Sequence, residues 1–296
     1  MPTVLVIGDV MTDVIVRPDG PIAIGADRRA DIRVLPGGAG ANQACWLAHE
    51  GLSVRFAARV GASDRARQKM LLASYGVDAR LGADETQPTG TLVNLLSADG
   101  ERSFLTDRGA NLKLGRADLP PSLLDGVDLL HVSGYMLFEE GPRPAVLEII
   151  AEARRRKIPF AVDPASSSFL QEVGRDRFLD WTKDAKFLFP NSDEAQALTG
   201  ASEPDAQLAI LTQTFPIVAL KRGRDGAMVV EGDKRWSVPA PNVSALDTSG
   251  AGDAFLGGFL GAYLSGEGTE AALRRGVELG SQSVTTFGAR PPLPAA

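Results

Sequence analysis

The chain has very few cysteine and histidine residues. Its 296 residues include one cysteine, Cys45, and two histidines, His49 and His131. A lone cysteine cannot close an internal disulfide, and these three residues do not have the spacing of a zinc site. The scarcity of cysteine suits a reducing compartment, so we expect a cytoplasmic protein. Two isolated histidines also argue against a catalytic triad built around histidine.

Long apolar runs and basic clusters are scarce as well. No apolar stretch reaches the roughly 20 residues that a transmembrane helix needs, so we expect no membrane partner. The N-terminus runs directly into a strand pattern, Val4–Ile7, without the basic start of a signal peptide. The net charge is −6, and the longest basic run, Arg154–Lys157, follows a helical pattern. We therefore expect no nucleic-acid partner.

Short apolar runs alternate with helical patterns along the chain. Buried strands are expected at 4–7, 54–59, 129–132, 160–162, 187–189 and 217–220, with a hairpin at 226–230 and 235–238. Helices are expected at 41–49, 65–75, 143–157, 193–198, 203–214 and 254–264. This alternation predicts an α/β fold with a doubly wound, largely parallel sheet flanked by helices. We expect one domain over residues 1–296, with 290–296 as a loose end.

Two regions contain strand patterns without helices between them. The patterns are Val14–Arg17 with Asp31–Leu35, and Thr91–Leu96 with Arg102–Thr106. Ala98–Glu101 is a strong hairpin signal within the second region. Strands without helices need burial elsewhere.

One segment, Asp247–Phe255, combines small residues, a carboxylate and the start of a helix. Gly250, Ala251 and Gly252 carry little or no side chain, so a ligand can approach their backbone N–H groups. The first N–H groups of a helix lack partners within it, and the helix dipole favours negative charge there. The segment is therefore typical of a phosphate site. Asp253 either caps the helix or, in a kinase, accepts the proton of the attacking hydroxyl.

Two segments resemble motifs of the ribokinase-like (PfkB) carbohydrate kinase family. Asp247–Phe255 is similar to the family motif Asp-Thr-(Thr/Ser)-Gly-Ala-Gly-Asp-(Ala/Ser)-Phe, and Pro36–Ala44 is similar to its glycine-rich N-terminal motif. The glycines of Pro36–Ala44 do not follow the dinucleotide fingerprint. The resemblance covers about residues 3–290 and implies a ribokinase-like fold. In that family strands of this kind form a small β-sheet, which here would comprise about 13–36 and 89–110 inserted in the α/β core. That sheet is a lid over the sugar site and often pairs with a second subunit, which implies a homodimer.

The resemblance implies an enzyme that uses ATP and Mg²⁺ to phosphorylate a hydroxymethyl group of a sugar or sugar-like molecule. Asp253 would be the catalytic base, and Gly250, Ala251 and Gly252 would form the anion hole. Substrate-binding candidates follow strands or lie in the glycine-rich motif. They are Asp9, Asp13, Gly37, Gly38, Asn42 and Tyr135. Without the resemblance, Asp9 is equally well interpreted as a turn residue and Tyr135 as a core aromatic.

A second group of residues is assigned to the nucleotide and cations. The nucleotide-binding candidates are Asn191, Lys221, Gly223, Gly226 and Ser281. Glu194, in the family's Asn-x-x-Glu motif, would hold Mg²⁺ through water, since Mg²⁺ keeps several waters and needs few carboxylates. Asp247 is the candidate for a monovalent cation, with K⁺ preferred. Asp163 follows a strand and either points toward the phosphates or caps the turn before Pro164.

The identity of the substrate is left open by departures from the family pattern. Ribokinases usually have Lys where this chain has Ala39, which puts ribose itself in question. Members of the family often have Asn two residues before the acidic residue that matches Asp13, and this chain has Met11 there instead. Asp107–Asn111 resembles a turn of ribokinases and keeps free pentoses among the candidates. A nucleoside kinase, for adenosine or pseudouridine, needs a platform for the base, and Phe104 and Phe138 are candidates for it.

Two further alternatives involve charge or the loss of catalysis. A 2-keto-3-deoxy sugar acid or a sugar phosphate needs extra cations, for which Arg33, Arg102 and Arg108 are candidates. A non-catalytic nucleotide or sugar sensor on the same fold is the remaining alternative, because fold alone does not establish activity. The presence of Asp253 argues against a sensor, since a binding protein has no need of a base.

Overall fold

The computed structural model describes residues 1–96 and 102–293, with only the backbone of Arg102. Within these residues the larger sheet has nine strands. Their order is β13 (Lys234–Val238), β12 (Ala227–Glu231), β11 (Ile217–Lys221), β10 (Phe187–Leu188), β9 (Phe160–Asp163), β8 (Leu129–Ser133), β1 (Thr3–Ile7), β4 (Ser53–Gly61) and β5 (Val77–Asp84). Neighbours from β11 to β5 pair in parallel, and β12 and β13 add antiparallel pairs at one edge.

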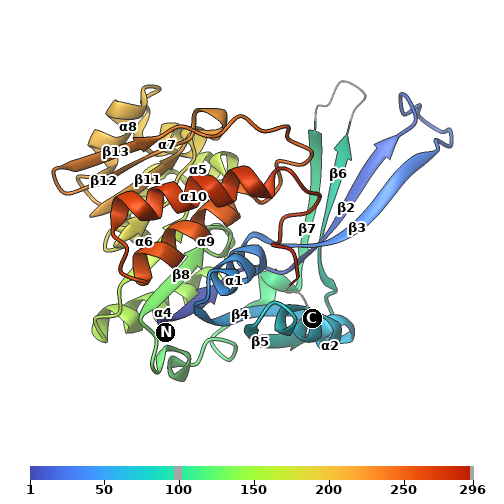
Figure 1. Cartoon of the computed structure of the whole chain (residues 1–296). Coiled ribbons are helices and arrows are strands. Elements are labelled where there is room, and N and C mark those ends of the chain that lie inside the picture. Colours follow the sequence, from blue (N-terminus) through green and yellow to red (C-terminus); the bar gives the residue numbers. More distant parts are fainter. Residues whose placement is uncertain (97–101, 294–296) are drawn as a thin grey trace.

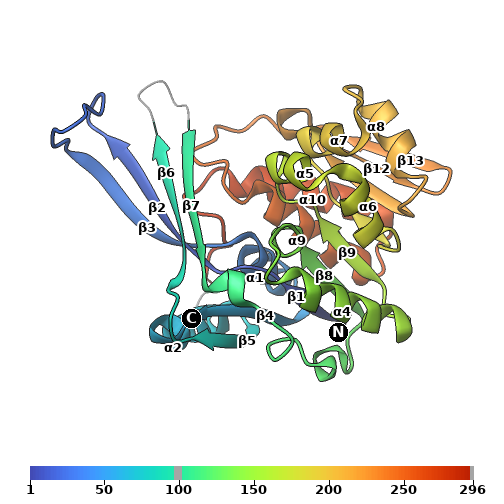
Figure 2. The ribbon, with the colours of Figure 1, turned by 180° about the vertical axis from the view of Figure 1, so that it is seen from behind.

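Helices cover both faces of this sheet (Figures 1 and 2). They are α1 (Ala39–His49), α2 (Arg65–Ala73), α3 (Tyr135–Phe138), α4 (Arg143–Arg155), α5 (Ser167–Val173), α6 (Arg175–Thr182), α7 (Ser192–Thr199), α8 (Pro204–Leu211), α9 (Ala251–Leu264) and α10 (Thr269–Ser283). Side chains of α1, α9 and α10 pack on one face, and those of α4, α7 and α8 pack on the other. No described helix combines the length and the apolar character needed to span a bilayer.

The interior strand β1 shows why its sequence does not alternate between apolar and polar residues. Val4 and Val6 join the hydrophobic cluster under α1 and α9, whereas Leu5 and Ile7 join the cluster on the opposite face. All four side chains are completely buried. A parallel strand with helices on both sides is apolar at every position, so its sequence is a continuous hydrophobic run. The predicted doubly wound α/β fold is therefore confirmed.

Several element boundaries differ from the sequence prediction. The helix expected at 143–157 ends at Arg155, and the helix expected at 254–264 begins at Ala251. Strand β5 and helices α3, α5, α6 and α10 were not predicted. Strand β5 (sequence VDARLGAD) is partly exposed at the sheet edge and has no apolar run to mark it. Helix α10 contains two glycines, which lower helix propensity, and its packing against α9 overrides that local preference.

The smaller sheet, which we call the lid, projects from one end of the core (Figure 1). Its strands, in order, are β3 (Ala30–Gly37), β2 (Met11–Pro18), β6 (Thr89–Leu96) and β7 (Arg102–Gly109). Strands β2 and β6 pair in parallel, and the other two pairs are antiparallel. The hairpin signal Ala98–Glu101 lies outside the described residues. The presence of a smaller sheet beside the α/β core agrees with the sequence prediction.

The pairing register gives the lid two distinct faces. One cross-strand row contains Leu35, Asp13, Leu92 and Thr106, and the next row outward contains Arg33, Ile15, Asn94 and Phe104. Side chains alternate between faces along a strand, so these rows share the inner face, toward the core. The row of residues between these two rows points to the outer face of the lid. Its four residues are all apolar, and they are Val34, Val14, Val93 and Leu105.

Candidate active site

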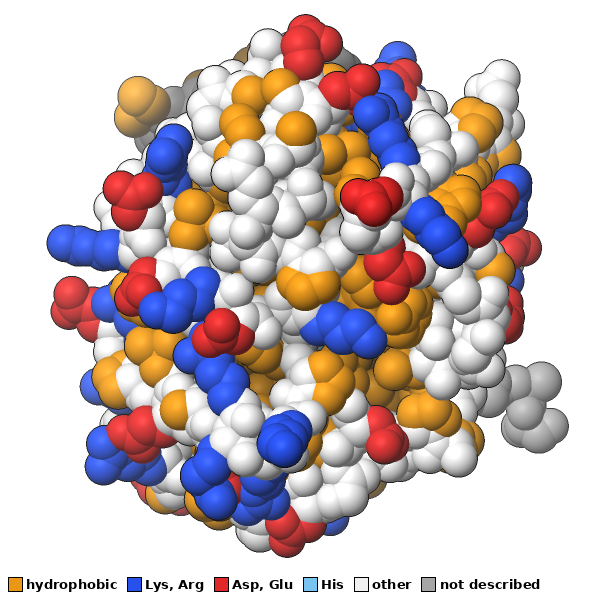
Figure 3. Space-filling model, turned by 90° about the vertical axis from the view of Figure 1, so that its left-hand side faces the viewer, with side chains coloured by type: hydrophobic (Ala, Val, Ile, Leu, Met, Phe, Trp, Pro, Cys, Tyr) orange, Lys and Arg blue, Asp and Glu red, His pale blue; other side chains and the backbone are white. Residues whose placement is uncertain are grey.

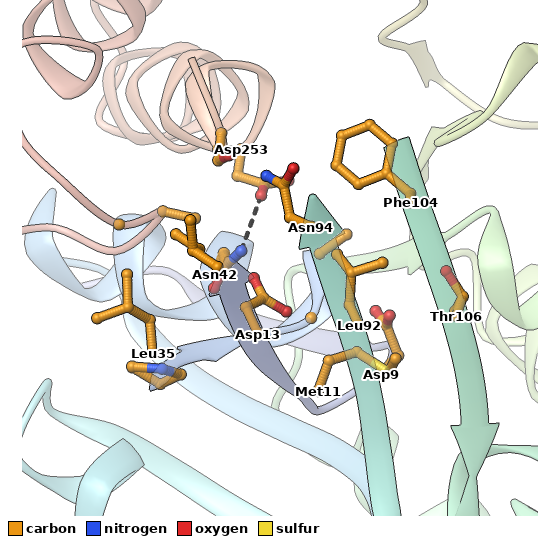
Figure 4. Close-up of a pocket in the computed structure, with 18 of the residues that line it drawn as sticks. Asp9, Met11, Asp13, Leu35, Asn42, Leu92, Asn94, Phe104, Thr106 and Asp253 are labelled. Atoms are coloured by element: carbon orange, nitrogen blue, oxygen red, sulfur yellow. Dashed lines mark hydrogen bonds between the residues drawn. The ribbon is translucent and has the colours of Figure 1, made fainter. Parts of the chain in front are cut away.

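A cavity of about 220 Å³ lies between the lid, the loop before α1 and the start of α9. Polar side chains of the core line one side, and the inner face of the lid lines the other (Figure 4). The predicted site residues around it are Asp9, Asp13, Gly38, Asn42, Tyr135, Asp247, Gly250 and Asp253. The fold thus brings residues from distant parts of the sequence to one place. Carboxyl ends of parallel strands are where such sites form.

Helix α9 begins at this cavity with a sharp turn. Gly250, its N-cap, adopts a left-handed conformation with φ of 76°. A Cβ at Gly250 would lie 2.5 Å from the Cβ of Ala289, so only glycine fits. Of the N–H groups that open the helix, that of Ala251 makes one long hydrogen bond, of 3.5 Å, to the carbonyl of Thr248. N–H groups at the start of a helix are suited to bind an anion.

The carboxylate of Asp253 lies in the first turn of α9, at the wall of the cavity (Figure 4). Its Oδ2 accepts a hydrogen bond of 3.2 Å from Nδ2 of Asn42, on α1. Burial raises the pKa of Asp253 well above its usual value; the negative charge of Asp163 adds to this increase, and the bond from Asn42 opposes it. A carboxylate with a raised pKa is suited to accept a proton from a hydroxyl.

Asn42 is itself held in place by Arg290, a residue of the C-terminal segment. Nε of Arg290 donates to Oδ1 of Asn42, and Nη2 of Arg290 donates to the carbonyl of Gly37, each over 3.2 Å. Arg290 is only 8% exposed. The expectation that 290–296 form a loose end is therefore wrong for Arg290. No sequence pattern marked this arginine, because its partners lie about 250 residues away along the chain.

Asp13 projects from the lid into the cavity, close to the glycine-rich loop. Its Oδ1 is buried and has no hydrogen-bond partner among the described residues. A Cβ at Gly37 would lie 2.1 Å from this oxygen, so Gly37 leaves the space that the carboxylate occupies without lining the cavity itself. Burial raises the pKa of Asp13 to about 6; the charge of Asp9 also raises it, and Arg290 opposes.

Asp9 is engaged within the protein. Its Oδ1 accepts from the backbone N–H of Gly40, and its Oδ2 accepts from Nη1 of Arg108, each at 3.0 Å. The guanidinium of Arg108 stacks on the ring of Tyr135, 3.8 Å from the ring centre. Tyr135 therefore lines the cavity with its ring covered by Arg108. Burial raises the pKa of the Tyr135 hydroxyl to about 12.

A second cavity, of about 900 Å³, lies on the other side of the α9 start. The predicted nucleotide-binding residues Asn191, Lys221, Gly223, Gly226 and Ser281 all line it. Phe255, Val243 and Val277 add apolar surface to the same cavity. Ala251 and Gly252 also line it. The first turn of α9 therefore borders both cavities.

Lys221 is fixed beside the first turn of α9. Its Nζ donates to Oδ2 of Asp163 over 2.8 Å, and a Cβ at Gly252 would lie 3.3 Å from Nζ. Burial lowers the pKa of Lys221, but the charges of Asp163 and Glu194 more than offset it, so the pKa is raised. The lysine thus stays positively charged next to the N–H groups of α9. Asp163 is the strand-end carboxylate whose two roles the sequence left open.

Glu194 is part of the helix cap of α7. Both carboxylate oxygens accept from Asn191, one from the backbone N–H and one from Nδ2, each at 2.8 Å. Oδ1 of Asn191 in turn accepts from the backbone N–H of Glu194. Burial raises the pKa of Glu194 to about 7, and Lys221 counteracts this. Among the described residues that line the second cavity, Asn191 is included and Glu194 is not.

Asp247 joins the α9 loop to the C-terminal segment. Its Oδ1 accepts from the backbone N–H of Ser249 at 3.0 Å, and its Oδ2 accepts from that of Gly288 at 3.2 Å. No group of three or more His, Cys, Asp or Glu side chains among the described residues has the arrangement of a metal site. A cation bound here would need backbone oxygens or waters in addition to Asp247.

Two candidate residues from the sequence, Phe138 and Arg33, lie away from the first cavity. Phe138, a possible base platform, is 6% exposed and packs in the core against Phe169, so it does not line the first cavity. Arg33 pairs with Asp31 and stacks over Phe287 at the lid edge. The side chain of Arg102 lies outside the described residues. Sequence reasoning also missed Asn94, whose side chain lines the cavity and is 4% exposed.

Comparison of the sequence with curated proteins found related kinases. The chain is 28% identical over 304 residues to the ribokinase of Bacillus subtilis (strain 168), covering 99% of this chain and 97% of that protein. It is 31% identical over 268 residues to the aminoimidazole riboside kinase of Salmonella typhimurium, covering 84% of this chain and 80% of that protein. These relatives act on different ribose-containing molecules, so their names alone do not identify one substrate.

Comparison with solved structures and family models places the fold and the family. The adenosine kinase of Sinorhizobium meliloti superimposes with a TM-score of 0.89 at 24% identity, covering 98% of this chain and 96% of that one. A protein of E. coli assigned as a ribokinase II, solved with ATP and Mg²⁺, gives a TM-score of 0.87 at 22% identity, covering 98% and 94%. The model of the pfkB family carbohydrate kinases matches residues 1–296. The chain therefore belongs to the pfkB family of carbohydrate kinases.

Proposed function

We propose that this kinase transfers the γ-phosphoryl group of ATP to a hydroxymethyl group of a neutral sugar or sugar-like molecule, with Asp253 as the base. The observation that carries the proposal is the position of the α9 start between the two cavities. Gly250 and Asp253 line the first, and Ala251 and Gly252 line the second. A hydroxyl held in one cavity and a phosphoryl group held in the other would meet at this helix N-terminus.

Each group at this junction has a chemical role in the proposal. Asp253 accepts the proton as the substrate oxygen bonds to the γ-phosphorus, and the bond from that phosphorus to the β–γ bridging oxygen breaks to release ADP. The N–H groups of Ala251 and Gly252 stabilise the negative charge on the transferred group. The ammonium of Lys221, 2.8 Å from Asp163, adds a positive charge on the nucleotide side.

The second cavity fits ATP together with Mg²⁺. Its apolar walls suit a purine, and its phosphate end has Lys221 and the α9 N-terminus. Mg²⁺ would screen phosphate charge here. Asn191 lines the cavity, and Glu194, with both oxygens bonded to Asn191, would act on the ion through water. We also propose a monovalent cation, K⁺ by preference, beside Asp247.

The charges around the first cavity favour a neutral substrate. Four carboxylates line it, those of Asp9, Asp13, Asp247 and Asp253, and Arg108 is the one cationic side chain among the described lining residues. Arg108 is already paired with Asp9. A sugar acid or sugar phosphate would bring further negative charge against these carboxylates without a free cation to receive it. A neutral polyol instead supplies hydroxyl donors, which carboxylates bind well.

A nucleoside is the second candidate substrate, and the inner face of the lid favours it. On this inner face, the row that lies farther from the core than Asp13 contains Ile15, Asn94 and Phe104 side by side. Oδ1 of Asn94 is buried and has no hydrogen-bond partner among the described residues. Apolar and aromatic surface around one unsatisfied amide oxygen suits a planar base that carries an N–H donor.

The outer face of the lid supports a homodimer. Its apolar row includes Val34, which is 64% exposed, and Leu105, which is 61% exposed, and Ile32 in the following row is 58% exposed. A contiguous apolar surface on an exposed face of a sheet is typical of an interface between proteins. We propose that the lids of two copies pack against each other through this face. By contrast, charged residues of both signs are mixed over the face of the core shown in Figure 3.

We propose a cytoplasmic location on the basis of cysteine use. Cys45 is the one cysteine in the chain, and it is a buried free thiol. Burial raises the pKa of this thiol to about 11, so it stays protonated and unreactive. A chain whose core needs no disulfide suits a reducing compartment.

A direct assay tests the proposed function. The purified protein with ATP and Mg²⁺ is offered ribose, fructose, deoxyribose, adenosine, cytidine and pseudouridine, and ADP release is measured. We expect turnover with one substrate class, and we expect Asp253→Asn to bind ATP normally while losing turnover by about 10²–10⁴-fold. Wild-type turnover in Asp253→Asn would show that Asp253 is not the base. Higher kcat/KM for free sugars than for nucleosides would decide against the second candidate.

A further inference from the structure

The C-terminal segment Gly288–Arg290 connects the two loops that form the proposed catalytic site. The N–H of Gly288 donates to Asp247, and Ala289 packs against Gly250 at the α9 start. Arg290 then reaches the other loop, where it bonds to Gly37 and Asn42. Trp46 anchors the same segment from α1, because its Nε1 donates to the carbonyl of Ala289 at 2.9 Å. The segment is therefore built into the site.

The contacts of Asn42 form a two-step chain of hydrogen bonds. Arg290 Nε donates to Oδ1 of Asn42, and Nδ2 of the same amide donates to Oδ2 of Asp253. Both bonds are 3.2 Å long. Asn42 is 4% exposed and Arg290 is 8% exposed, so water does not compete freely for either bond. Asp253 thus receives its hydrogen bond from an amide whose other end is held by a cation.

The chemistry of these groups permits only one orientation of the Asn42 amide. A guanidinium can only donate hydrogen bonds, so it must face the amide oxygen. An ionised carboxylate can only accept, so it must face the amide NH₂. Without Arg290, only the ionised form of Asp253 would hold the Asn42 amide in this orientation. A protonated Asp253 could donate its O–H to the amide oxygen, so the amide would be free to turn over and the protonated, inactive form of the base would be favoured.

We propose that Arg290 is a positioning residue for phosphoryl transfer: by holding Oδ1 of Asn42, it keeps the Asn42 amide turned to donate to the base Asp253. The inference rests on the proposed function, because it gives Arg290 its role through Asp253. Arg290 is not one of the described residues that line the substrate cavity, so it acts through Asn42. Its removal should weaken the chemical step more than ATP binding.

The direction of the pH effect follows from the groups that face Asp253. Asp163 on β9 and Asp9 after β1 raise its pKa, while Lys221 on β11 and the Asn42 bond lower it. Loss of the Asn42 bond removes one of the groups that favour the ionised carboxylate. The pKa of Asp253 then rises further, and the base is ionised only at higher pH. The acid limb of the kcat profile should move upward.

The test compares Arg290→Met, Arg290→Lys and Trp46→Phe. Arg290→Met removes every donor and should lower kcat by about 10- to 100-fold, as expected for a misplaced catalytic group. It should also shift the acid limb of kcat to higher pH, with KM for ATP unchanged. Arg290→Lys keeps the charge and one donor and should recover part of kcat. Trp46→Phe removes the other anchor of the same segment and should leave the acid limb in place.

A double-mutant cycle between Arg290 and Asn42 decides whether the effect passes through the amide. If it does, Arg290→Met in an Asn42→Ala background should cost little beyond Asn42→Ala alone. The proposal would be overturned if the effects of the two substitutions on kcat multiply in the double variant. It would also be overturned by an unshifted acid limb in Arg290→Met, or by an equal shift of the acid limb in Trp46→Phe. If Arg290→Met does not fold, Arg290→Lys carries the same cycle.

Asp253→Asn, assayed in parallel, separates the two proposals. Wild-type turnover in Asp253→Asn would remove the base and thereby the proposed function. An inactive Asp253→Asn with an additive cycle would overturn only the role of Arg290.

Discussion

Lys221 and Asp163 form a nearly buried ion pair between two strand ends, with Nζ 2.8 Å from Oδ2. Their side chains are 13% and 5% exposed, respectively. The pair keeps a positive charge next to Gly252, and this charge also lowers the pKa of Asp253. Lys221 therefore has both a structural partner and, in the proposed reaction, a phosphate to screen.

Lys221→Met should separate these two roles. The change leaves the charge of Asp163 buried without its partner, so the free energy of unfolding should fall by about 3–5 kcal/mol. Urea unfolding measures this loss. Lys221→Met with Asp163→Asn should regain much of the stability but little of the turnover, because the positive charge is still missing. Full turnover in the double variant would show that Lys221 is structural only.

Asp13→Ala should weaken sugar binding without affecting ATP. Each charge-assisted hydrogen bond that Asp13 makes to a substrate hydroxyl is worth about 1.5–3 kcal/mol, so KM for the sugar should rise tenfold or more. ATP affinity, measured by calorimetry without sugar, should stay constant because Asp13 does not line the second cavity. Weakened ATP binding with intact sugar affinity would mean that the two cavities are assigned in reverse.

The raised pKa of Asp13 also predicts two pH effects. Its pKa is about 6 in the folded protein against 3.8 ordinarily, so the ionised, hydroxyl-binding form is lost below about pH 6 and KM for the sugar should rise there. Between these values the folded state holds the extra proton, so this group's contribution to stability falls as pH rises. Asp13→Asn should therefore stabilise the protein at pH 8 by about 1–3 kcal/mol. A flat KM profile from pH 5 to 8 would contradict the first effect.

Glu194→Gln should raise the Mg²⁺ concentration needed for half-maximal turnover several-fold. The substitution removes the negative charge behind Asn191 and leaves the sugar cavity unchanged, so KM for the sugar should not move. Asp193→Asn is the matched control, since Asp193 is the exposed neighbour on the same helix. An unchanged Mg²⁺ requirement in Glu194→Gln would assign Glu194 to capping α7 alone.

Val34→Lys should dissociate the proposed homodimer. The change places a charge at the β3 end of the apolar row on the outer face of the lid, which burial against a second copy would not tolerate. Light scattering coupled to gel filtration should show the wild type as a dimer and the variant as a monomer. Met70→Lys is the control, because Met70 is 70% exposed but lies on α2, away from the lid. A monomeric wild type would contradict the dimer.

The sequence by itself determined much of the core and the family. Continuous apolar runs such as Val4–Ile7 mark strands buried on both faces, because no position there meets water. The segment Asp247–Phe255 could be recognised as typical of a phosphate site, since small residues, a helix start and a carboxylate are adjacent in the chain. Local patterns of this kind survive in the linear sequence, and the family model confirmed the resemblance that they indicated.

Only the tertiary structure decided which residues complete the site. Arg290 meets Asn42 across 248 positions, and Lys221 meets Asp163 across 58, so no local spacing announces either contact. Asn94 became a candidate only when the strand register placed it beside Phe104 on the inner face of the lid. Hydrogen bonds and ion pairs depend on distances of about 3 Å in space, and sequence separation does not report such distances. The sequence therefore indicated the kinase family, and the fold identified the groups that hold the proposed base in place.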